Sequence, residues 1–432
     1  MPQVGRPRKI YQTSTGMHDI LPEDWVYFQK IFQVVKNIAN FYGFSRIETP
    51  IIENNELFEK GIGLTTDIIE KQMYSFRTKG GDYVSLRPEG TAPIARAYIQ
   101  HGMFNLPQPV KLWHFGPFFR YEHPQAGRYR QFWQFGFEVI GEGSPIIDVQ
   151  VIQIMYNILK ELKFKNLIID INSIGCPSCR AYYKKLLVSY FKDREASLCA
   201  DCRRRLRENP LRILDCEEEK CQPVKAQAPQ IIDHLCEECH NHFKEVLEFL
   251  DELELPYHLN PYLVRGLDYY TKTVFEIVND SGEGRKVGTL AAGGRYDNLV
   301  KILSGKPTPA CGGAGGIERI IELIKQQQIK FRMISPQPKV FLAQLGVLAK
   351  RKSLKLFEEF REAGISVTES FSRDSLKAQL RIADRLGVRY SLILGQKEAL
   401  EGTIIVREMT TGKQEVAKLD KIVKEMKKKL KK

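Results

Sequence analysis

The chain has 432 residues, which suggests roughly two to four domains, and 43% of them are hydrophobic, enough for substantial cores. No apolar run is long enough to span a bilayer, and the basic residues 1–10 lack the apolar segment of a secretory signal, so we expect a cytoplasmic protein without a membrane partner. The formal net charge of +13 favours an anionic partner such as a nucleic acid, although excess lysine also simply solubilises surfaces.

The N-terminal part of the chain predicts a helix, an extended segment and a hairpin. Apolar residues recur at helical spacing over residues 26–40, and Glu23 or Asp24 suits the first turn of such a helix. Residues 44–52 are predicted to be extended, and Pro50 limits their ladder pairing to an edge or an interface. Strands are predicted at 110–121 and 132–140, joined by a polar, glycine-containing loop.

The middle of the chain changes character between residues 174 and 259. This block is cysteine-rich, highly charged and helix-like, and it interrupts strand-forming regions, so we interpret it as an insertion. Shorter strands are predicted at 274–278 and 290–292, followed by a helix over 317–325. Several antiparallel strands interleaved with helices favour an α+β fold over a doubly wound sheet.

The C-terminal part predicts a separate small domain after the linker Ser335 to Pro338. Strands and helices alternate there, which indicates an α/β domain with a parallel sheet. The predicted strands are 340–345, 366–369, 390–394 and 404–407, and the predicted helices are 349–363 and 376–386. The basic tail 424–432 is interpreted as a solvated helix end. The expected domains are a core in two parts, an insertion and this C-terminal domain, over residues 1–173 with 260–330, 174–259 and 339–432.

Three distant segments place an arginine beside acids or glycines: Arg120 in 119–122, Arg265 in 263–270 and Arg319 in 315–319. A guanidinium stays charged and grips phosphate oxygens two at a time, and glycines let a backbone approach a ligand closely. Each segment alone is a weak signal, because an Arg beside a Glu is usually a surface ion pair. No glycine-rich loop with a lysine of the P-loop type occurs, so a nucleotide is not expected to bind in that manner.

Together and in this order, these segments resemble the second and third signature motifs of class II aminoacyl-tRNA synthetases. Segment 263–270 narrows the resemblance to histidyl-tRNA synthetases, and further similar segments extend it over nearly the whole chain: 16–22, 87–91, 127–138 and 292–297. The resemblance implies an antiparallel-sheet catalytic core, a helical insertion and a C-terminal anticodon-binding domain. It also implies a homodimer whose interface is motif 1, with Pro50 as its proline.

The same resemblance implies ATP-dependent ligation of L-histidine to tRNA(His) through a histidyl-adenylate, with Mg²⁺ accompanying the ATP. The histidine carboxylate is itself the nucleophile, so the reaction needs positioning and positive charge more than a base. Arg120 is expected on the α-phosphate, Arg319 near the γ-phosphate, and Arg265 close to the histidine carboxylate and α-phosphate. Glu122 would lie by the adenine, and Glu318 belongs to the same ATP site.

The histidine pocket implied by the resemblance needs an acid for the α-ammonium group and polar groups for both imidazole nitrogens. Because a neutral imidazole has one donor and one acceptor nitrogen, Glu138 accepting and Tyr270 donating would distinguish it from other rings. Core packing with satisfied hydroxyls is the alternative for the tyrosines. The residues assigned to histidine, besides Arg265, are Glu89, Thr91, Gln134, Glu138, Tyr269, Tyr270 and Tyr296.

Some positions depart from the family pattern. Gly313 and Gly316 stand where bulky residues are common, which predicts room beneath the nucleotide. In the motif 2 loop, His123 and Ala126 replace residues that are often basic. The sequence therefore does not determine which tRNA nucleotides this loop contacts. Trp133 stands where histidine is common.

Another reading of the chain is a catalytically silent, histidine-sensing paralogue such as the regulatory subunit of ATP phosphoribosyltransferase. That relative lacks the C-terminal domain and does not keep the full set of arginines. Here Arg120, Arg265 and Arg319 are all present and residues 340–407 supply the extra domain, which favours the enzyme.

Eight of the nine cysteines lie in the insertion as close pairs, and three of the four pairs have CxxC spacing. Such spacing lets two thiolates grip one tetrahedral zinc, so four pairs can furnish two closed Cys₄ sites of structural Zn²⁺. Disulfides are less expected in a cytoplasmic enzyme, and free thiols are the remaining alternative. Cys311 is interpreted as a small buried hydrophobe. The pairs are Cys176/Cys179, Cys199/Cys202, Cys216/Cys221 and Cys236/Cys239.

Overall fold

The computed structural model describes residues 11–63, 66–123, 127–280, 286–331 and 338–430. Contacts between Cα atoms divide the chain into two compact units, residues 1–331 and 332–432. Within the described ranges, no helix is both long and apolar enough to cross a membrane.

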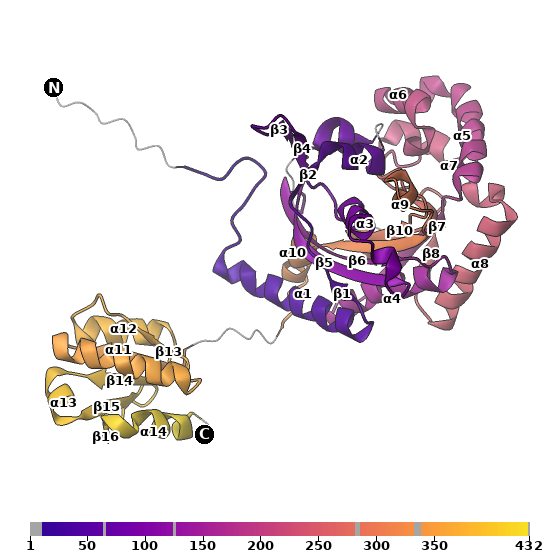
Figure 1. Cartoon of the computed structure of the whole chain (residues 1–432). Coiled ribbons are helices and arrows are strands. Elements are labelled where there is room, and N and C mark those ends of the chain that lie inside the picture. Colours follow the sequence, from indigo (N-terminus) through magenta and orange to yellow (C-terminus); the bar gives the residue numbers. More distant parts are fainter. Residues whose placement is uncertain (1–10, 64–65, 124–126, 281–285, 332–337, 431–432) are drawn as a thin grey trace, which may run out of the picture. The chain divides into compact units, whose positions relative to one another are not determined.

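The described part of the first unit is built on an eight-stranded sheet in the order β1-β5-β6-β11-β10-β9-β7-β8 (Figure 1). Its six inner strands pair antiparallel, and only the short edge strands β1 and β8 add in parallel. This sheet confirms the predicted α+β class. The strands are β1 (Ser45–Arg46), β5 (Val110–Phe119), β6 (Gln131–Ile140), β7 (Leu167–Ser173), β8 (Tyr257–Leu259), β9 (Thr271–Asp280), β10 (Lys286–Arg295) and β11 (Ala310–Gly316).

The strands β9 and β10 are longer than the apolar runs at 274–278 and 290–292 that predicted them. Their register continues from Lys286 opposite Asp280 to Arg295 opposite Thr271, with two irregularities in between. Ladder hydrogen bonds come from the backbone, so pairing extends through polar and glycine positions that carry no hydrophobic signal.

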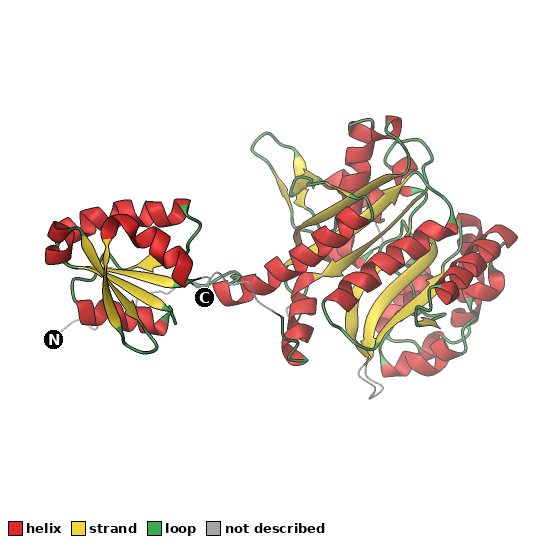
Figure 2. Ribbon diagram, turned by 90° about the horizontal axis from the view of Figure 1, so that it is seen from below, coloured by secondary structure: helices red, strands yellow, loops and turns green. Residues whose placement is uncertain are grey.

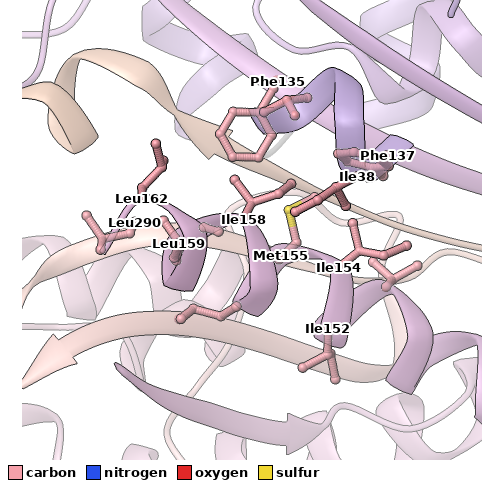
Figure 3. Packing of buried hydrophobic residues seen from close by; sticks show 14 of the residues in the cluster. Ile38, Phe135, Phe137, Ile152, Ile154, Met155, Ile158, Leu159, Leu162 and Leu290 are labelled. Atoms are coloured by element: carbon pink, nitrogen blue, oxygen red, sulfur yellow. The ribbon is translucent and has the colours of Figure 1, made fainter. Parts of the chain in front are cut away.

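One face of the sheet is covered by α1 (Pro22–Phe41) and α4 (Pro145–Glu161) around the larger core. Figure 3 shows Ile154, Met155 and Ile158 of α4 lying close to Phe135 and Phe137 of β6. The helix α1 begins at Pro22, four residues before its predicted start, because proline suits the first turn and Glu23 and Asp24 follow it there.

A second core lies around α2 (Asn55–Ile62) and α3 (Thr91–Gln100). The predicted extended segment 44–52 is divided between β1 and a separate sheet, with an exposed Pro50 between the two. Within the described residues this sheet has three strands, in the order β2-β4-β3. The helix α10 (Ile317–Gln326) packs into the first core. The other elements of the first unit outside the insertion are β2 (Ile52–Asn54), η1 (Ile68–Gln72), β3 (Ser75–Arg77), β4 (Tyr83–Leu86), η2 (Met103–Asn105) and α9 (Leu299–Ile302).

The predicted insertion 174–259 is helical from α5 to α8 and packs into the first unit, but its last three residues form the edge strand β8 of the main sheet. Phe243, Val246 and Leu250 of α8 join the core around α4, while α5 joins the second core. A buried Asp148 on α4 accepts hydrogen bonds from Arg295 of β10 and lies within hydrogen-bond distance of His242 on α8, so Asp148 links the insertion to the sheet. Its elements are α5 (Pro177–Lys192), η3 (Glu195–Ser197), α6 (Ala200–Glu208), η4 (Pro210–Ile213), η5 (Glu219–Cys221), α7 (Gln222–Ala226), η6 (Ile231–His234) and α8 (Glu237–Glu252).

The second unit has a five-stranded sheet in its described residues, in the order β13-β12-β14-β15-β16, with helices on both faces (Figure 2). The expected parallel sheet holds for β13, β12 and β14, but β15 and β16 add antiparallel. The expectation was wrong there because β16, the fifth strand, carries mostly exposed side chains and gives no apolar run.

Alternate side chains of the central strands enter different cores, one beneath α12 and one beneath α11, α13 and α14. The tail helix α14 buries Ile422 and Met426, so its lysines project from an amphipathic helix. The elements are β12 (Val340–Gln344), α11 (Val347–Glu362), β13 (Val367–Glu369), α12 (Leu376–Arg385), β14 (Tyr390–Leu394), α13 (Gln396–Glu401), β15 (Thr403–Glu408), β16 (Gln414–Lys418), η7 (Leu419–Lys421) and α14 (Ile422–Lys429).

Candidate active site

A cavity of about 360 Å³ opens over β6, β10 and β11, between the β5–β6 hairpin and the start of α10. Its wall carries many ionic side chains, and the hairpin, the loop before β9 and α10 contribute them. The arginines in its lining are Arg120, Arg128, Arg265 and Arg319, and the carboxylates are Glu122, Glu276 and Glu318. Such a concentration of guanidinium groups suits a polyphosphate anion.

Neighbouring groups hold Arg120 and Arg319 in place at this cavity. The Nε of Arg120 donates to the carbonyl of Pro88 at 2.9 Å, and its guanidinium lies 5.4 Å from the centroid of the Phe132 ring. The Nη1 of Arg319 donates to the carbonyl of Thr289 at 2.9 Å. Burial, together with the like charge of Arg128, lowers the pKa of Arg319, so an anion here would relieve an electrostatic penalty.

Arg265 forms an ion pair with Glu276 of β9, which the sequence analysis did not select. Thr289 of β10 donates to the second oxygen of Glu276 at 2.6 Å. The available signal was one acid in the middle of the apolar strand 274–278, a position that a purely structural strand face would rarely give to a glutamate. Glu276 and Thr289 therefore join the candidate site.

Glu318 lies in the cavity wall, as predicted, but it also anchors the fold. Both of its carboxylate oxygens accept the backbone N–H of Trp133 at 2.9 Å, which ties the first turn of α10 to β6. Burial raises the pKa of Glu318 to about 7 in spite of these bonds. Trp133 itself packs against Trp25, Phe28 and Phe115.

Most of the residues assigned to histidine form a buried cluster that is linked by hydrogen bonds. Thr91 donates to Glu138 at 2.9 Å, and Tyr296 donates to the other oxygen of that carboxylate. Glu89 accepts the backbone N–H groups of Thr91 and Ala92 at the start of α3, and the Tyr269 hydroxyl lies 3.3 Å from the same carboxylate.

The buried Arg87 holds the segment that carries Glu89 through hydrogen bonds, and Gly90 lets this segment pass close to a neighbouring ring. Arg87 donates to the Thr49 carbonyl at 2.7 Å and to the Pro117 carbonyl at 3.0 Å. A Cβ on Gly90 would lie 2.8 Å from the His114 ring, so the backbone approaches this ring more closely than other residues allow.

Glycines in β11 leave room for neighbouring side chains on both faces of the sheet. Gly312 lies opposite Glu138, and a Cβ there would meet the Glu138 carboxylate at 1.8 Å. The expectation of room beneath a nucleotide was wrong for Gly313, because its Cβ position faces Phe275 and Met155 in the core. Gly316 lines the cavity, and no atom lies within 4 Å of its Cβ position.

The predicted residues thus fall into two groups. Arg120, Glu122, Gln134, Arg265, Glu318 and Arg319 line the open cavity. Glu89, Glu138, Tyr269, Tyr270 and Tyr296 are buried, with Thr91 partly buried among them. Arg265 and Tyr270 connect the two groups, because the Arg265 guanidinium lies 5.6 Å from the Tyr270 ring centroid. His123 is exposed, and Ala126 lies outside the described residues.

The eight insertion cysteines gather into two clusters of four. We call Cys176, Cys179, Cys236 and Cys239 the first cluster, and Cys199, Cys202, Cys216 and Cys221 the second. In each cluster all four sulfur atoms lie within 4.8 Å of one another. All nine cysteines are described and free of disulfides, and Cys311 is fully buried in β11, as predicted.

Comparisons with known proteins find matches that cover both units of the chain. The family model of histidyl-tRNA synthetases matches residues 16–181 and 191–320, and that of the anticodon binding domain matches 339–429. A histidine–tRNA ligase of Dehalococcoides mccartyi is 45% identical over 98% of this chain and 100% of its own length. A histidine–tRNA ligase of Acetivibrio thermocellus is 43% identical over 97% of this chain and 100% of its own length. The crystal structure of apo S. aureus histidyl-tRNA synthetase is 36% identical, with a TM-score of 0.79 over 96% of this chain and 99% of that chain.

Glu138 provides a test of the buried cluster through pH. Burial raises its pKa from 4.5 to about 8, against the hydrogen bonds from Tyr296 and Thr91. The folded protein therefore holds a proton that the unfolded chain releases, so stability falls as pH rises between these two values.

We expect the melting temperature of the ligand-free protein to fall, relative to a Glu138→Gln variant, as pH rises from about 5 to the folded pKa of about 8. The free energy of unfolding, relative to that of the variant, should fall by at most about 1.4 kcal/mol per pH unit. Calorimetry of both proteins measures it, and a constant difference in melting temperature would contradict a buried, protonated Glu138.

Proposed function

Because the chain belongs to the histidyl-tRNA synthetase family, we propose that the arginine-lined cavity and the buried tyrosine cluster are the ATP and histidine parts of one active site. The reaction is the ligation of L-histidine to tRNA(His) through a histidyl-adenylate, with release of AMP and diphosphate. The supporting observation is that Arg120, Arg265 and Arg319, from three distant segments, line a single cavity beside the cluster.

In the first step the histidine carboxylate attacks the α-phosphorus of ATP. Arg120 and Arg265 stabilise the charge that develops there, while Arg319 holds the terminal phosphates. Glu276 orients the Arg265 guanidinium through their ion pair, and Glu122 lies beside the adenine. Mg²⁺ would further neutralise the phosphates, and the carboxylate oxygens of Glu122 and Glu276 have the ligand chemistry that it prefers.

In the histidine part of the site, Glu89 and Thr91 receive the α-ammonium group, Gln134 and Glu138 line the pocket, and the three tyrosines enclose the side chain. Burial raises the pKa of Glu89, so a bound ammonium group would favour its ionised form. Glu138 and Tyr270 present an acceptor and a donor to the two imidazole nitrogens.

The second unit supplies tRNA contacts in addition to those of the catalytic unit. Its match to the anticodon binding domain and the net charge of +13 both suit a polyanionic partner. This domain and the complete set of arginines leave the catalytically silent paralogue without support. We place the reaction in the cytoplasm, where free thiols are stable.

We expect Arg265→Ala to reduce histidine-dependent pyrophosphate exchange on the order of 100- to 1000-fold, because one charge contact to the transition state is lost. Arg77→Ala is the matched control, since Arg77 is exposed on β3 and outside the cavity lining. Circular dichroism checks that both variants are folded. Near-normal exchange by Arg265→Ala would overturn the assignment.

A homodimer through motif 1 completes the proposed enzyme. The inner face of α1 is buried against its own core, yet the end of this helix exposes Phe41 at 82%, and the segment before β2 and its first residue expose Ile51 at 41% and Ile52 at 49%. Pro50, next to Ile51 in the chain, is exposed as well. Large exposed apolar side chains in the motif 1 segment support a surface that a second copy covers.

We expect the double variant Phe41→Asp/Ile51→Asp to be monomeric by light scattering and to lose aminoacylation, because the interface would bury two charges. Val188→Asp, on the exposed face of α5, is the control and should remain a dimer. A stable, fully active monomer of the unmodified chain would refute this proposal.

The two cysteine clusters are structural zinc sites. Tetrahedral Zn²⁺ is bound by four thiolates at about 2.3 Å, which requires sulfur atoms nearly 4 Å apart. The sulfurs of Cys176 and Cys179 are 3.6 Å apart, and those of Cys199 and Cys216 are 4.0 Å apart. Backbone N–H groups of Cys236 and Cys199 also donate to sulfurs in the clusters, which stabilises thiolates.

We expect elemental analysis after dialysis to find about two zinc ions per chain, one for each cluster. Cys202→Ser should lose about one of them, whereas Cys311→Ser, outside the clusters, should lose none. Less than about 0.2 zinc per chain in the unmodified protein would reject both sites.

A further inference from the structure

The loop between β8 and β9, residues 260–270, carries Arg265, Tyr269 and Tyr270 but has no helix or strand of its own. It therefore lacks the repeated backbone hydrogen bonds that would fix its conformation. The position of these three side chains depends on where neighbouring elements hold the loop.

Asp268, directly before the tyrosine pair, is the residue where that support converges. Its backbone N–H donates to the carbonyl of Ile62 at 2.9 Å. Its carbonyl accepts a hydrogen bond from Arg180 at 3.2 Å, and its carboxylate accepts one from Asn209 at 3.2 Å. A Cβ on Gly63 would lie 2.7 Å from the same carboxylate, so the backbone of Gly63 packs closely against Asp268.

Both partners belong to the insertion and lie in segments that carry cluster cysteines. Arg180 follows Cys179 directly, and its backbone N–H donates to the carbonyl of Cys176 at 3.0 Å, within the first cluster. Asn209 lies in the segment between Cys202 and Cys216 of the second cluster, at the junction of α6 and η4. Asn209 is only 5% exposed, so the surrounding residues confine its side chain.

The segment around the second cluster also contacts the loop near its arginine. Arg212 of η4 donates to Asp67 at 2.8 Å, and its Nη1 lies 3.3 Å from the Cβ position of Gly266. The segment from Cys199 to Cys221 consists of one nine-residue helix and short 3₁₀ turns, which are too short to be stable alone. A closed metal site is the kind of cross-link that fixes such a segment.

We propose that the two zinc sites set the affinity for histidine, because Arg180 and Asn209 hold Asp268 and thereby position the adjacent Tyr269 and Tyr270. Arg180 and Asn209 are positioning residues. The inference rests on the zinc sites and on the histidine-binding role of the loop proposed above. It adds that metal occupancy in the insertion controls substrate binding in the active site.

The test compares Arg180→Ala, Asn209→Ala and Cys202→Ser with the unmodified protein in histidine-dependent pyrophosphate exchange. For Asn209→Ala and Arg180→Ala we expect unchanged zinc content and an increase in KM for histidine of about 3- to 10-fold each, the effect of one lost hydrogen bond. The KM for ATP and kcat should change little. Arg203→Ala, exposed on α6, is the control and should leave all three constants unchanged.

Cys202→Ser should lose about one zinc per chain and raise the KM for histidine at least as much as Asn209→Ala. If it loses zinc while KM for histidine stays normal, the coupling is overturned although the zinc sites stand. If the unmodified protein holds no zinc, the metal sites fail, and metal control of histidine affinity fails with them. An equal loss of kcat and of affinity for both substrates in Asn209→Ala would indicate general damage and overturn the positioning role.

Discussion

The antiparallel ladder between β6 and β11 is the constraint on which the rest of the site depends. Its register places Gly312 opposite Glu138 and Gly316 opposite Gln134, so two polar side chains of β6 have free space beside them. A shift of one residue would turn both into the core, where Phe135 and Phe137 now pack. The glycines are therefore a requirement of close approach, and any side chain at Gly312 would collide with the carboxylate.

Around this ladder several ionisable side chains are buried away from water. Burial raises the pKa values of Glu89, Glu138 and Glu318, with the like charge of Glu89 adding to the effect at Glu138, while, in spite of burial, Glu276 raises the pKa of Arg265. Such an arrangement is destabilising until a ligand with complementary charges arrives. In the proposed site, histidine would bring an ammonium group to the acids and ATP would bring anionic oxygens to the arginines, which is how preorganised sites use burial to favour binding.

The insertion shows how a peripheral segment can contribute to such a site. Between its two long helices α5 and α8 it has only short helices and turns, yet Asp148, His242 and Arg295 tie α8 to the sheet, and Asp268 ties the loop before β9 to Arg180 and Asn209 of the insertion. Rigidity in a loop that lacks regular structure has to come from outside it. The protein obtains that rigidity from many small contacts rather than from one large core.

Local patterns in the sequence determined much of this protein: the strands β5 and β6, the helices α1 and α10, the arginine set and the four cysteine pairs all follow from spacing and residue type. The pairing of the cysteines into two clusters, the Arg265–Glu276 ion pair, the antiparallel addition of β15 and β16 and the core-facing side of Gly313 required the tertiary structure. Each of these depends on contacts between residues far apart in the chain, which periodicity over a few neighbouring residues cannot encode.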